Sequence, residues 1–297
     1  MVDASSCYAN QVSVVLGQLW SAADAAAVSR LTTVLEGTAP LGVAFSGGVD
    51  SSVLLALAAR ELGADRVVGI LGVSPSLAAV EREAAHRIAE FIGVRVVEIE
   101  TYEGDRPEYV RNGPDRCFHC KDELFSRIAD VVAIEHELRA VAYGDNADDV
   151  LRSDRPGSRA ATAHGVLRPL ADAGLDKAAV RRIARALRLP CADKPAAPCL
   201  ASRIPHFDTV DPLKLAQIEQ AEAALHDLGF GEVRVRHHGD IARIELAKPD
   251  IERAAAEPTR KAIHTAVREA GFRFVVVDLA GLQSGAFTMP LLATAHG

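Results

Sequence analysis

Short apolar runs separated by longer amphipathic segments fill the first two thirds of the chain. The runs at 41–45, 66–73, 94–99 and 139–143 have the length and continuous hydrophobicity of buried strands. The segments between them are long enough for helices, and residues 9–36 show apolar side chains at helical spacing ahead of the first run. Strands that alternate with helices indicate βαβ units, so this pattern predicts an α/β fold with a parallel sheet.

From about residue 206 the pattern changes: two longer helical segments are expected, together with short segments in which apolar and polar positions alternate. Helices are expected at 212–228 and 250–270, and strands at 232–236, 241–246 and 272–278. We therefore predict two domains: a larger one at 1–205 that contains the parallel sheet, and a smaller α+β domain at 206–297.

The composition agrees with this fold and narrows the class of protein. Apolar residues make up 49% of 297, enough for a full core, and no apolar run approaches the roughly 20 residues that span a bilayer. The net charge of −7 speaks against a broad nucleic-acid surface. The N-terminus lacks the basic-then-apolar pattern of a signal peptide, so we expect a cytoplasmic protein with neither a membrane nor a nucleic acid as partner.

A glycine turn follows the first apolar run, and a helix is expected to begin near Val53. Glycines let the backbone close around phosphate oxygens, and a helix N-terminus favours negative charge. Serine hydroxyls add donors, whereas the acidic Asp50 would contact phosphate through Mg²⁺. An ordinary turn is the alternative, but the pattern favours an ATP phosphate site. Its residues are Ser46, Gly47, Gly48, Asp50, Ser51 and Ser52.

A second candidate for metal binding follows the fourth apolar run. The sequence Gly144-Asp-Asn-Ala-Asp-Asp149 puts three carboxylates at the expected carboxyl end of a strand, where parallel sheets bind ligands. One interpretation is a turn that caps the next helix, which Asn and Asp favour. The other is that Asp149 helps Asp50 to hold Mg²⁺, because hard oxygen ligands suit that ion.

The five cysteines are odd in number and unevenly placed, which does not fit a secreted disulfide framework. Cys117-x-x-Cys120 is compatible with buried thiols, a redox pair, structural zinc or an iron–sulfur cluster. Zinc would need four ligands, which His119, Cys191 and Cys199 offer. A cluster with one open iron needs only one further thiolate, and Cys199, in a proline-rich irregular stretch, is the candidate.

Arg234 and Arg236 alternate on the strand expected at 232–236. They are either solvated charges on an edge strand or a pair that recognises a phosphate or carboxylate through bidentate hydrogen bonds. The adjacent His237 and His238 are expected at the surface rather than as metal ligands.

Longer motifs resemble those of one family. They are Ser46-Gly-Gly-Val-Asp-Ser-Ser52, Pro114-Asp-Arg-Cys-Phe-His-Cys-Lys121, Tyr143-Gly-Asp-Asn-Ala-Asp-Asp149, Arg155-Pro-Gly157, Asp193-Lys-Pro-Ala-Ala-Pro-Cys-Leu-Ala-Ser-Arg203, Arg234-Val-Arg236 and Asp278-Leu279. From about residue 41 onward the chain resembles the LarE family of ATP-dependent sulfur transferases, which make the nickel-pincer nucleotide cofactor of lactate racemase. The first motif is common to PP-loop ATP pyrophosphatases, whereas Pro-Cys-Leu-Ala-Ser-Arg is much more specific.

The resemblance implies a Rossmann-like PP-loop domain and a two-step reaction. A carboxylate of pyridinium-3,5-biscarboxylic acid mononucleotide is adenylylated by ATP, and sulfur then replaces AMP to give a thiocarboxylate. It also implies nucleotide or substrate contacts for Asn146, Ser202 and Arg203, a bound substrate phosphate at Arg234 and Arg236, and a supporting role for Glu222. The C-terminal domain is then expected to bind substrate and to build a homo-oligomer.

The three cysteines separate two types within that family. Some members lack the Cys-x-x-Cys pair and use the cysteine at the Cys199 position as a sacrificial sulfur donor. Others carry the pair, hold a [4Fe-4S] cluster on all three cysteines and deliver sulfide from its fourth iron. With Cys117, Cys120 and Cys199 all present, the resemblance implies the cluster type, with a sulfide source that the sequence does not name.

Two features depart from the family pattern: His164 stands where an acidic residue is expected, and the stretch after Val73 is less typical. Cys191 has no role in the pattern and is expected to be a buried thiol. Two other kinds of protein remain as alternatives. One is a different PP-loop enzyme, such as a tRNA thiolase or an amide-forming synthetase. The other is a non-catalytic nucleotide-binding module stabilised by zinc.

Overall fold

The computed structural model describes residues 20–151, 156–283 and 287. Cys7, Arg155 and the first part of the helical segment predicted at 9–36 lie outside these residues. The chain forms two compact units that do not each correspond to one continuous stretch of sequence. The first unit comprises residues 1–73, 79–101 and 120–197, and the second comprises 74–78, 102–119 and 198–297.

The first unit contains a four-stranded sheet in the order β3-β2-β1-β4, and all its strand pairs are parallel. Its strands are β1 (Leu41–Ala44), β2 (Val67–Val73), β3 (Val96–Glu100) and β4 (Ala140–Tyr143). The strands lie at the four positions where apolar runs predicted them, which confirms the α/β class. Because the sheet is parallel, the carboxyl ends of neighbouring strands meet at one edge.

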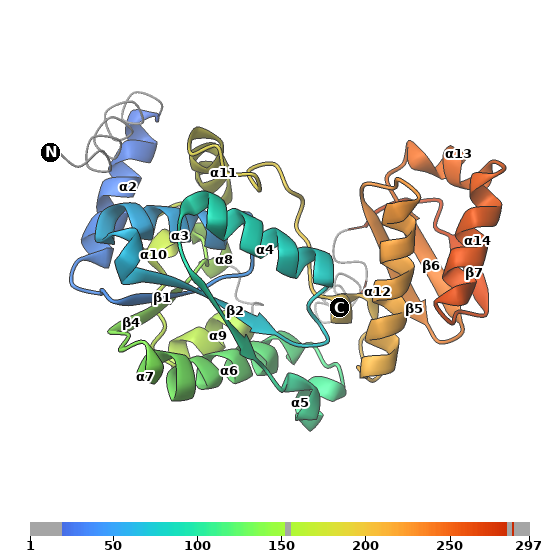
Figure 1. Ribbon diagram of the computed structural model, residues 1–297, viewed down its shortest axis with the longest axis horizontal. Helices are drawn as coiled ribbons and strands as arrows, with labels where there is room; N and C mark the ends of the chain where they lie inside the picture. Colours follow the sequence, from blue (N-terminus) through green and yellow to red (C-terminus); the bar gives the residue numbers. More distant parts are fainter. Residues whose placement is uncertain (1–19, 152–155, 284–286, 288–297) are drawn as a thin grey trace, which may run out of the picture. The chain divides into compact units, whose positions relative to one another are not determined.

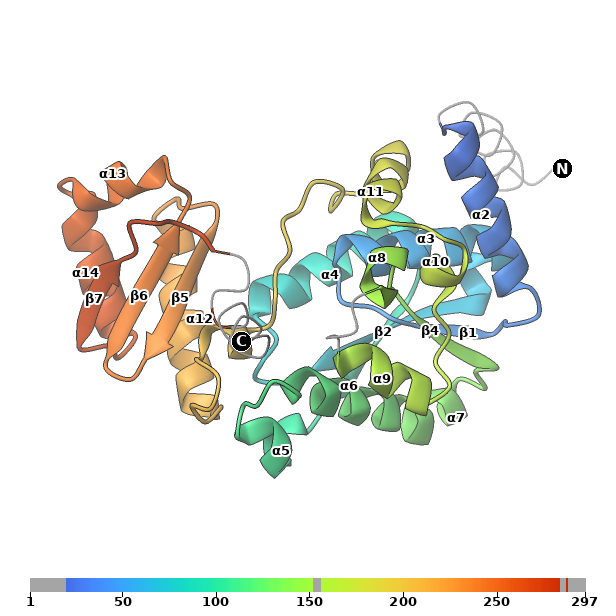
Figure 2. The same ribbon diagram turned by 180° about the vertical axis from the view of Figure 1, so that it is seen from behind.

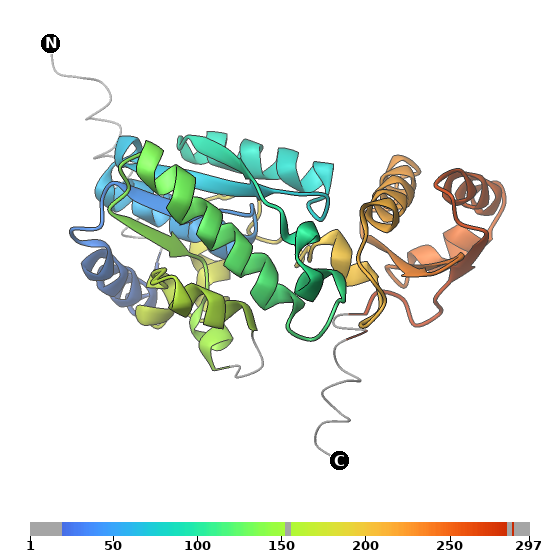
Figure 3. The ribbon, with the colours of Figure 1, turned by 90° about the horizontal axis from the view of Figure 1, so that it is seen from below.

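Helices cover both faces of this sheet. In Figures 1 and 2, α3 and α4 lie on one side of the strands and α6 and α7 on the other, and Figure 3 shows α6 in front of the sheet. The helices of this unit are α2 (Ala22–Leu35), α3 (Val49–Leu62), α4 (Ala79–Ile92), α6 (Arg116–Arg127), α7 (Ala133–Glu135), α8 (Ala147–Val150), α9 (Pro156–Ala163), α10 (Pro169–Asp172) and α11 (Lys177–Ala186), and the first turn of α6 belongs to the second unit. The central helix α3 is almost wholly buried, which its run of aliphatic side chains explains.

The second unit contains a three-stranded sheet in the order β5-β6-β7, with β5 antiparallel and β7 parallel to the central strand (Figure 2). Its elements are α5 (Pro107–Val110), α12 (Pro212–Asp227), β5 (Val233–His238), β6 (Ile241–Leu246), α13 (Asp250–Ala255), α14 (Thr259–Glu269) and β7 (Phe274–Val277). One face of the sheet packs against the helices around Phe230, Phe272 and Ile244. The opposite face carries the arginines of β5.

Three local predictions need correction. The segment at 250–270 is two helices, because the chain is extended at Ala256 and Pro258 precedes the second helix. The segment from Arg152 to Gly165 is rich in Arg, Ala, Ser and Gly, which predicts an ordered loop, but it contains the helix α9 at 156–163. Finally, α3 begins at Val49 rather than near Val53, so Asp50 lies in the first turn of the helix.

Among the described residues, no helix is both long and apolar enough to cross a bilayer.

Candidate active site

The predicted phosphate site lies where β1 meets α3. Gly47 has a φ of +70°, and a Cβ atom there would lie 2.9 Å from the Cα of Ala85, so both conformation and space require glycine. Gly48 is the N-cap residue of α3 and supplies no side chain to the first-turn N–H groups. An uncapped helix N-terminus behind a tight turn is suited to an anion.

Serine hydroxyls hold this turn in shape. Ser51 donates from Oγ to the Gly48 carbonyl at 3.1 Å and accepts from the Ser46 N–H at 3.3 Å. Ser52 also donates to the Gly48 carbonyl, at 2.8 Å. The Ser46 and Ser51 hydroxyl oxygens are 3.3 Å apart. The four residues therefore form one hydrogen-bonded turn.

The end of β4 approaches α3 closely and brings Asn146 into contact with Asp50. A Cβ atom at Gly144 would lie 2.7 Å from the Ser51 nitrogen, so only glycine allows this approach. Asn146 donates from Nδ2 to Asp50 Oδ1 at 3.1 Å and to Asp149 Oδ2 at 2.8 Å. Asn146 and Asp149 also form a capping box at the start of α8. The predicted turn that caps the next helix is therefore present. In addition, Asn146 connects Asp50 and Asp149, the two predicted Mg²⁺ ligands.

Lys177 completes this network, and the sequence reasoning missed it. Its Nζ contacts Asp50 Oδ2, and its backbone N–H donates to Asp148 Oδ2 at 3.0 Å. Lys177 is the first residue of α11, directly after the N-cap Asp176. The only sequence signal was the basic character of that helix. In the first unit, the ammonium group of Lys177 therefore lies against Asp50, the carboxylate that is predicted to hold Mg²⁺.

A second buried network lies at the end of β4. Asp145 accepts hydrogen bonds from Ser158 Oγ at 2.6 Å and from the Tyr143 hydroxyl, and Lys121 Nζ lies 4.0 Å from it. Burial, together with the hydrogen bond to Asp145, raises the pKa of Tyr143, so the phenol remains a donor. A Cβ atom at Gly157 would lie 2.8 Å from the Lys121 side chain, which explains a glycine there.

The predicted sulfur ligands lie on one helix and one loop. Cys117 and Cys120 occupy positions i and i+3 of α6, so they share a helix face; Cys117 is exposed and Cys120 half-buried. Cys199 is exposed and precedes a 3₁₀ turn at Leu200–Arg203. Cys191 is buried, as predicted. Within the described ranges, no group of three or more His, Cys, Asp or Glu side chains stands ready to hold a metal ion, so the cluster stays a prediction.

The surroundings of Cys199 are crowded although the residue keeps exposed surface. Desolvation by neighbouring atoms raises the pKa of its thiol, whereas the nearby guanidinium groups of Arg116 and Arg203 lower it. Arg116 is itself buried and precedes Cys117 directly. The second unit therefore brings one guanidinium close to two of the three candidate cysteines.

Three arginines gather around β5 in the second unit. Arg203 is paired with Glu222 through two hydrogen bonds, at 2.9 and 3.0 Å, and Arg236 is paired with Glu245 at 3.0 and 2.8 Å. Both pairs are buried. The interpretation of Arg236 as a solvated charge is therefore wrong, because its guanidinium is committed to a carboxylate.

Arg234 shares an acceptor with Arg236. The two residues donate to the Gln283 carbonyl at 2.8 and 3.0 Å, and burial and the guanidinium groups of Arg236 and Arg203 lower the pKa of Arg234. The three guanidinium groups therefore lie close enough to one another to attract an anion. Ser202 accepts hydrogen bonds from Arg203 at its Oγ and from Arg236 at its carbonyl, both at 3.0 Å.

The two histidines after Arg236 are not surface residues as predicted. His237 is buried and interacts with Gln217 at 3.1 Å, and its burial lowers its pKa. His238 is half-buried, and burial also lowers its pKa. Outside the predicted set, His164 interacts with Asp122 at 2.8 Å on α6.

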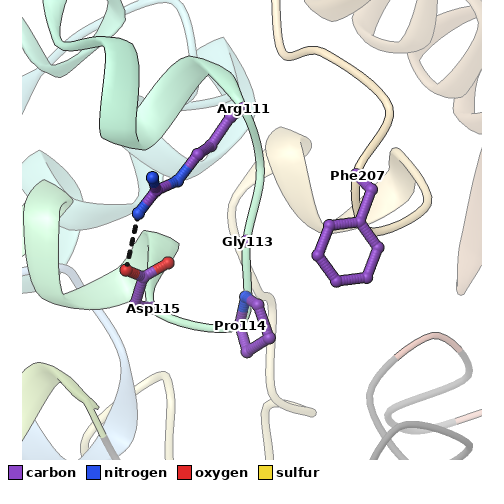
Figure 4. A pocket seen from close by; sticks show the side chains of 5 residues that line it. All are labelled: Arg111, Gly113, Pro114, Asp115 and Phe207. Atoms are coloured by element: carbon purple, nitrogen blue, oxygen red, sulfur yellow. Dashed lines mark hydrogen bonds and ion pairs between the residues drawn. The ribbon is translucent and has the colours of Figure 1, made fainter.

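A pocket of about 640 Å³ opens in the second unit between the 111–115 loop and Phe207 (Figure 4). Arg111 forms an ion pair with Asp115 at 3.1 Å along its wall. Phe207 is exposed and has a φ of +71°, a conformation that costs free energy in a residue with a Cβ atom. No predicted site residue lines this pocket.

The buried pair of Arg236 and Glu245 gives a prediction about stability. Glu245→Ala should lower the free energy of local unfolding of β6 by about 3–5 kcal/mol, because it leaves a buried guanidinium without its carboxylate. Native-state hydrogen exchange of the β6 amides measures this quantity. Glu269→Ala, an exposed change on α14, should shift it by less than about 0.5 kcal/mol. Equal protection in both variants would contradict the prediction.

Comparisons with known proteins identify relatives over most of this chain. A family model described as asparagine synthase matches residues 26–129. Pyridinium-3,5-bisthiocarboxylic acid mononucleotide synthase of Lactiplantibacillus plantarum is 32% identical over 262 residues, which cover 86% of this chain and 92% of that protein. An uncharacterized Synechocystis protein is 39% identical over 243 residues, covering 82% and 90%. An uncharacterized Methanocaldococcus jannaschii protein is 26% identical over 237 residues, covering 80% and 88%.

Proposed function

Because the chain belongs to the LarE family of PP-loop proteins, as its likeness to the Lactiplantibacillus plantarum synthase over most of both chains shows, we propose that it is an ATP-dependent sulfur transferase. Its substrate would be pyridinium-3,5-biscarboxylic acid mononucleotide. A carboxylate oxygen of the substrate attacks the α-phosphorus of ATP, pyrophosphate leaves, and sulfur then displaces AMP to give a thiocarboxylate. The observation that carries the proposal is the uncapped N-terminus of α3 behind a turn that only glycine can form.

The first unit supplies the groups for the adenylylation step. The turn from Ser46 to Gly48 and the hydroxyls of Ser51 and Ser52 would bind the phosphates of ATP. Asp50 fits Mg²⁺, because its Oδ2 already contacts the cationic Nζ of Lys177 and carboxylate oxygens suit that ion. Asn146 and Asp149 would support it from the neighbouring strand end. When bound, Mg²⁺ would neutralise charge on the phosphates.

The cysteines supply the donor set for sulfur delivery. Thiolates at Cys117, Cys120 and Cys199 would bind three of the four irons of a [4Fe-4S] cluster, and the fourth iron would remain open. When bound, such a cluster would supply an iron that holds sulfide as a renewable nucleophile. Cys117 and Cys120 share a helix face, and Cys199 is exposed, so each can serve as a ligand.

The arginine cluster of the second unit would hold the phosphate of the mononucleotide. Arg203 and Arg236, which glutamates hold in place, would add positive potential around Arg234 and so help it to bind the phosphate. Glu222 also accepts from the Val235 N–H at 2.8 Å, so it orients both Arg203 and β5. The small-molecule substrate is then the main partner, and we also propose assembly into a homo-oligomer through the second unit.

The match to the asparagine synthase model keeps an amide-forming PP-loop enzyme as the second candidate. That match covers 26–129 and so contains the phosphate site but neither Cys199 nor the arginine cluster. An ammonia-using synthetase has no need of three cysteines. Joint dependence of product formation on Cys117, Cys120 and Cys199 would separate the two functions.

The first experiment is anaerobic purification followed by assays of iron, sulfide and zinc and by a visible spectrum. About four irons per chain with broad absorption near ~400 nm would support the cluster. The same protein, given ATP, the biscarboxylate and sulfide, should release AMP and form a thiocarboxylate. Zinc at one per chain and no AMP release would overturn the proposed function.

A further inference from the structure

A buried polar bracket joins two separate segments of the second unit. Asn112 is 0% exposed and has a φ of +57°, and its Nδ2 donates to the carbonyls of Ile204, Pro205 and Asp208 at 3.3, 2.7 and 3.0 Å. Its own carbonyl accepts from the Phe207 N–H at 3.1 Å. One side chain thus holds the loop after Arg203 against the loop before Cys117.

Arg116 extends this bracket toward the cysteines. Its Nη1 donates to Asn112 Oδ1 at 2.5 Å and to the Ala201 carbonyl at 2.9 Å. Arg116 precedes Cys117 directly, and Ala201 follows Cys199 by two residues. A single guanidinium therefore connects the two chain segments that carry these cysteines.

We propose that Asn112 and Arg116 are positioning residues for sulfur delivery, an inference that rests on the proposed function. Asn112 fixes the two loops together, and the buried Arg116 ties the segment that carries Cys117 to the segment that carries Cys199. Cys120 follows one turn along α6, so the same bracket sets the helix face that presents both members of the pair.

The test compares Arg116→Met, Arg116→Lys and Asn112→Gly with Arg111→Met. Arg111 lies in the same loop, but its guanidinium is exposed and is paired with Asp115. Asn112→Gly removes the side chain while tolerating the positive φ. A thermal unfolding curve for each variant confirms that it is folded.

The first measurement needs no metal. With Cys7, Cys120 and Cys191 replaced by Ser or Ala, the reduced metal-free chain is treated with diamide. Diamide takes two electrons and two protons from the thiols of Cys117 and Cys199 and leaves a disulfide, which peptide mapping detects. We expect Arg116→Met and Asn112→Gly to form this cross-link at least about tenfold more slowly than the parent, and Arg111→Met at the parent rate.

The second measurement is iron release to a chelator after anaerobic reconstitution of the full chain. We expect release to be about tenfold faster for Arg116→Met, intermediate for Arg116→Lys, which keeps the charge but not the planar donor geometry, and unchanged for Arg111→Met. If the parent holds no iron but its cross-linking still depends on Arg116, the positioning role stands and the cluster assignment fails. Unchanged cross-linking and unchanged iron release in Arg116→Met, or no cross-link in the parent, would overturn the positioning role.

Discussion

Asp50→Ala should lower the rate of AMP formation by at least about 100-fold while leaving the fold intact. Removing one group that stabilises charge on a reacting phosphate or acyl centre typically costs about 10²–10³ in rate. Asp50 accepts a hydrogen bond from Asn146 and forms an ion pair with Lys177, and it lies in the first turn of α3. Its loss would leave no carboxylate at the helix N-terminus to bind Mg²⁺ with the phosphates.

The measurement is AMP and pyrophosphate release from ATP in the presence of the biscarboxylate substrate. Asp65→Ala is the matched control, because Asp65 is an exposed carboxylate of the same unit with no contact to the turn. Circular dichroism should be the same for all three proteins. Turnover in Asp50→Ala within a factor of three of the parent would refute the role of Asp50 in binding the metal.

The parallel sheet was predictable because its strands are buried on both faces and therefore read as continuous apolar runs. The glycine turn that we propose as the phosphate site was predictable for a similar reason: its glycines and the start of its helix are contiguous in sequence. The start of α3 was placed four residues too late, because polar residues in its first turn do not continue the apolar period. Those residues, Asp50 to Ser52, belong to the proposed phosphate site.

The partners of these residues were not predictable from local patterns. Lys177 is separated from Asp50 by 127 positions, and only the packing of α11 near α3 brings them together. The burial of Arg236 depends on the pairing of β5 with β6, which places Glu245 within reach. A strand pattern alone cannot show which face of a sheet is covered. The bracket of Asn112 and Arg116 likewise depends on contacts across about 90 residues of sequence.

Replacing any one of Cys117, Cys120 or Cys199 by Ala should reduce bound iron from about four per chain to less than about one. A [4Fe-4S] cluster with one open iron depends on three thiolates, and two do not hold it. Cys191→Ala is the matched control, because it removes a thiol that is buried in the first unit. It should keep its iron and lose only about 1 kcal/mol of stability.

The same variants distinguish a bound cluster from a sacrificial cysteine. If Cys199 donated its own sulfur, the chain would lose the mass of hydrogen sulfide in one turnover, and Cys117→Ala and Cys120→Ala would still complete that turnover. If sulfide is delivered from a cluster, the mass of the chain stays constant over many turnovers and all three variants fail together. The presence of all three cysteines in the chain favours the second outcome. Normal iron content in any of the three variants would contradict the assignment of that residue as a ligand.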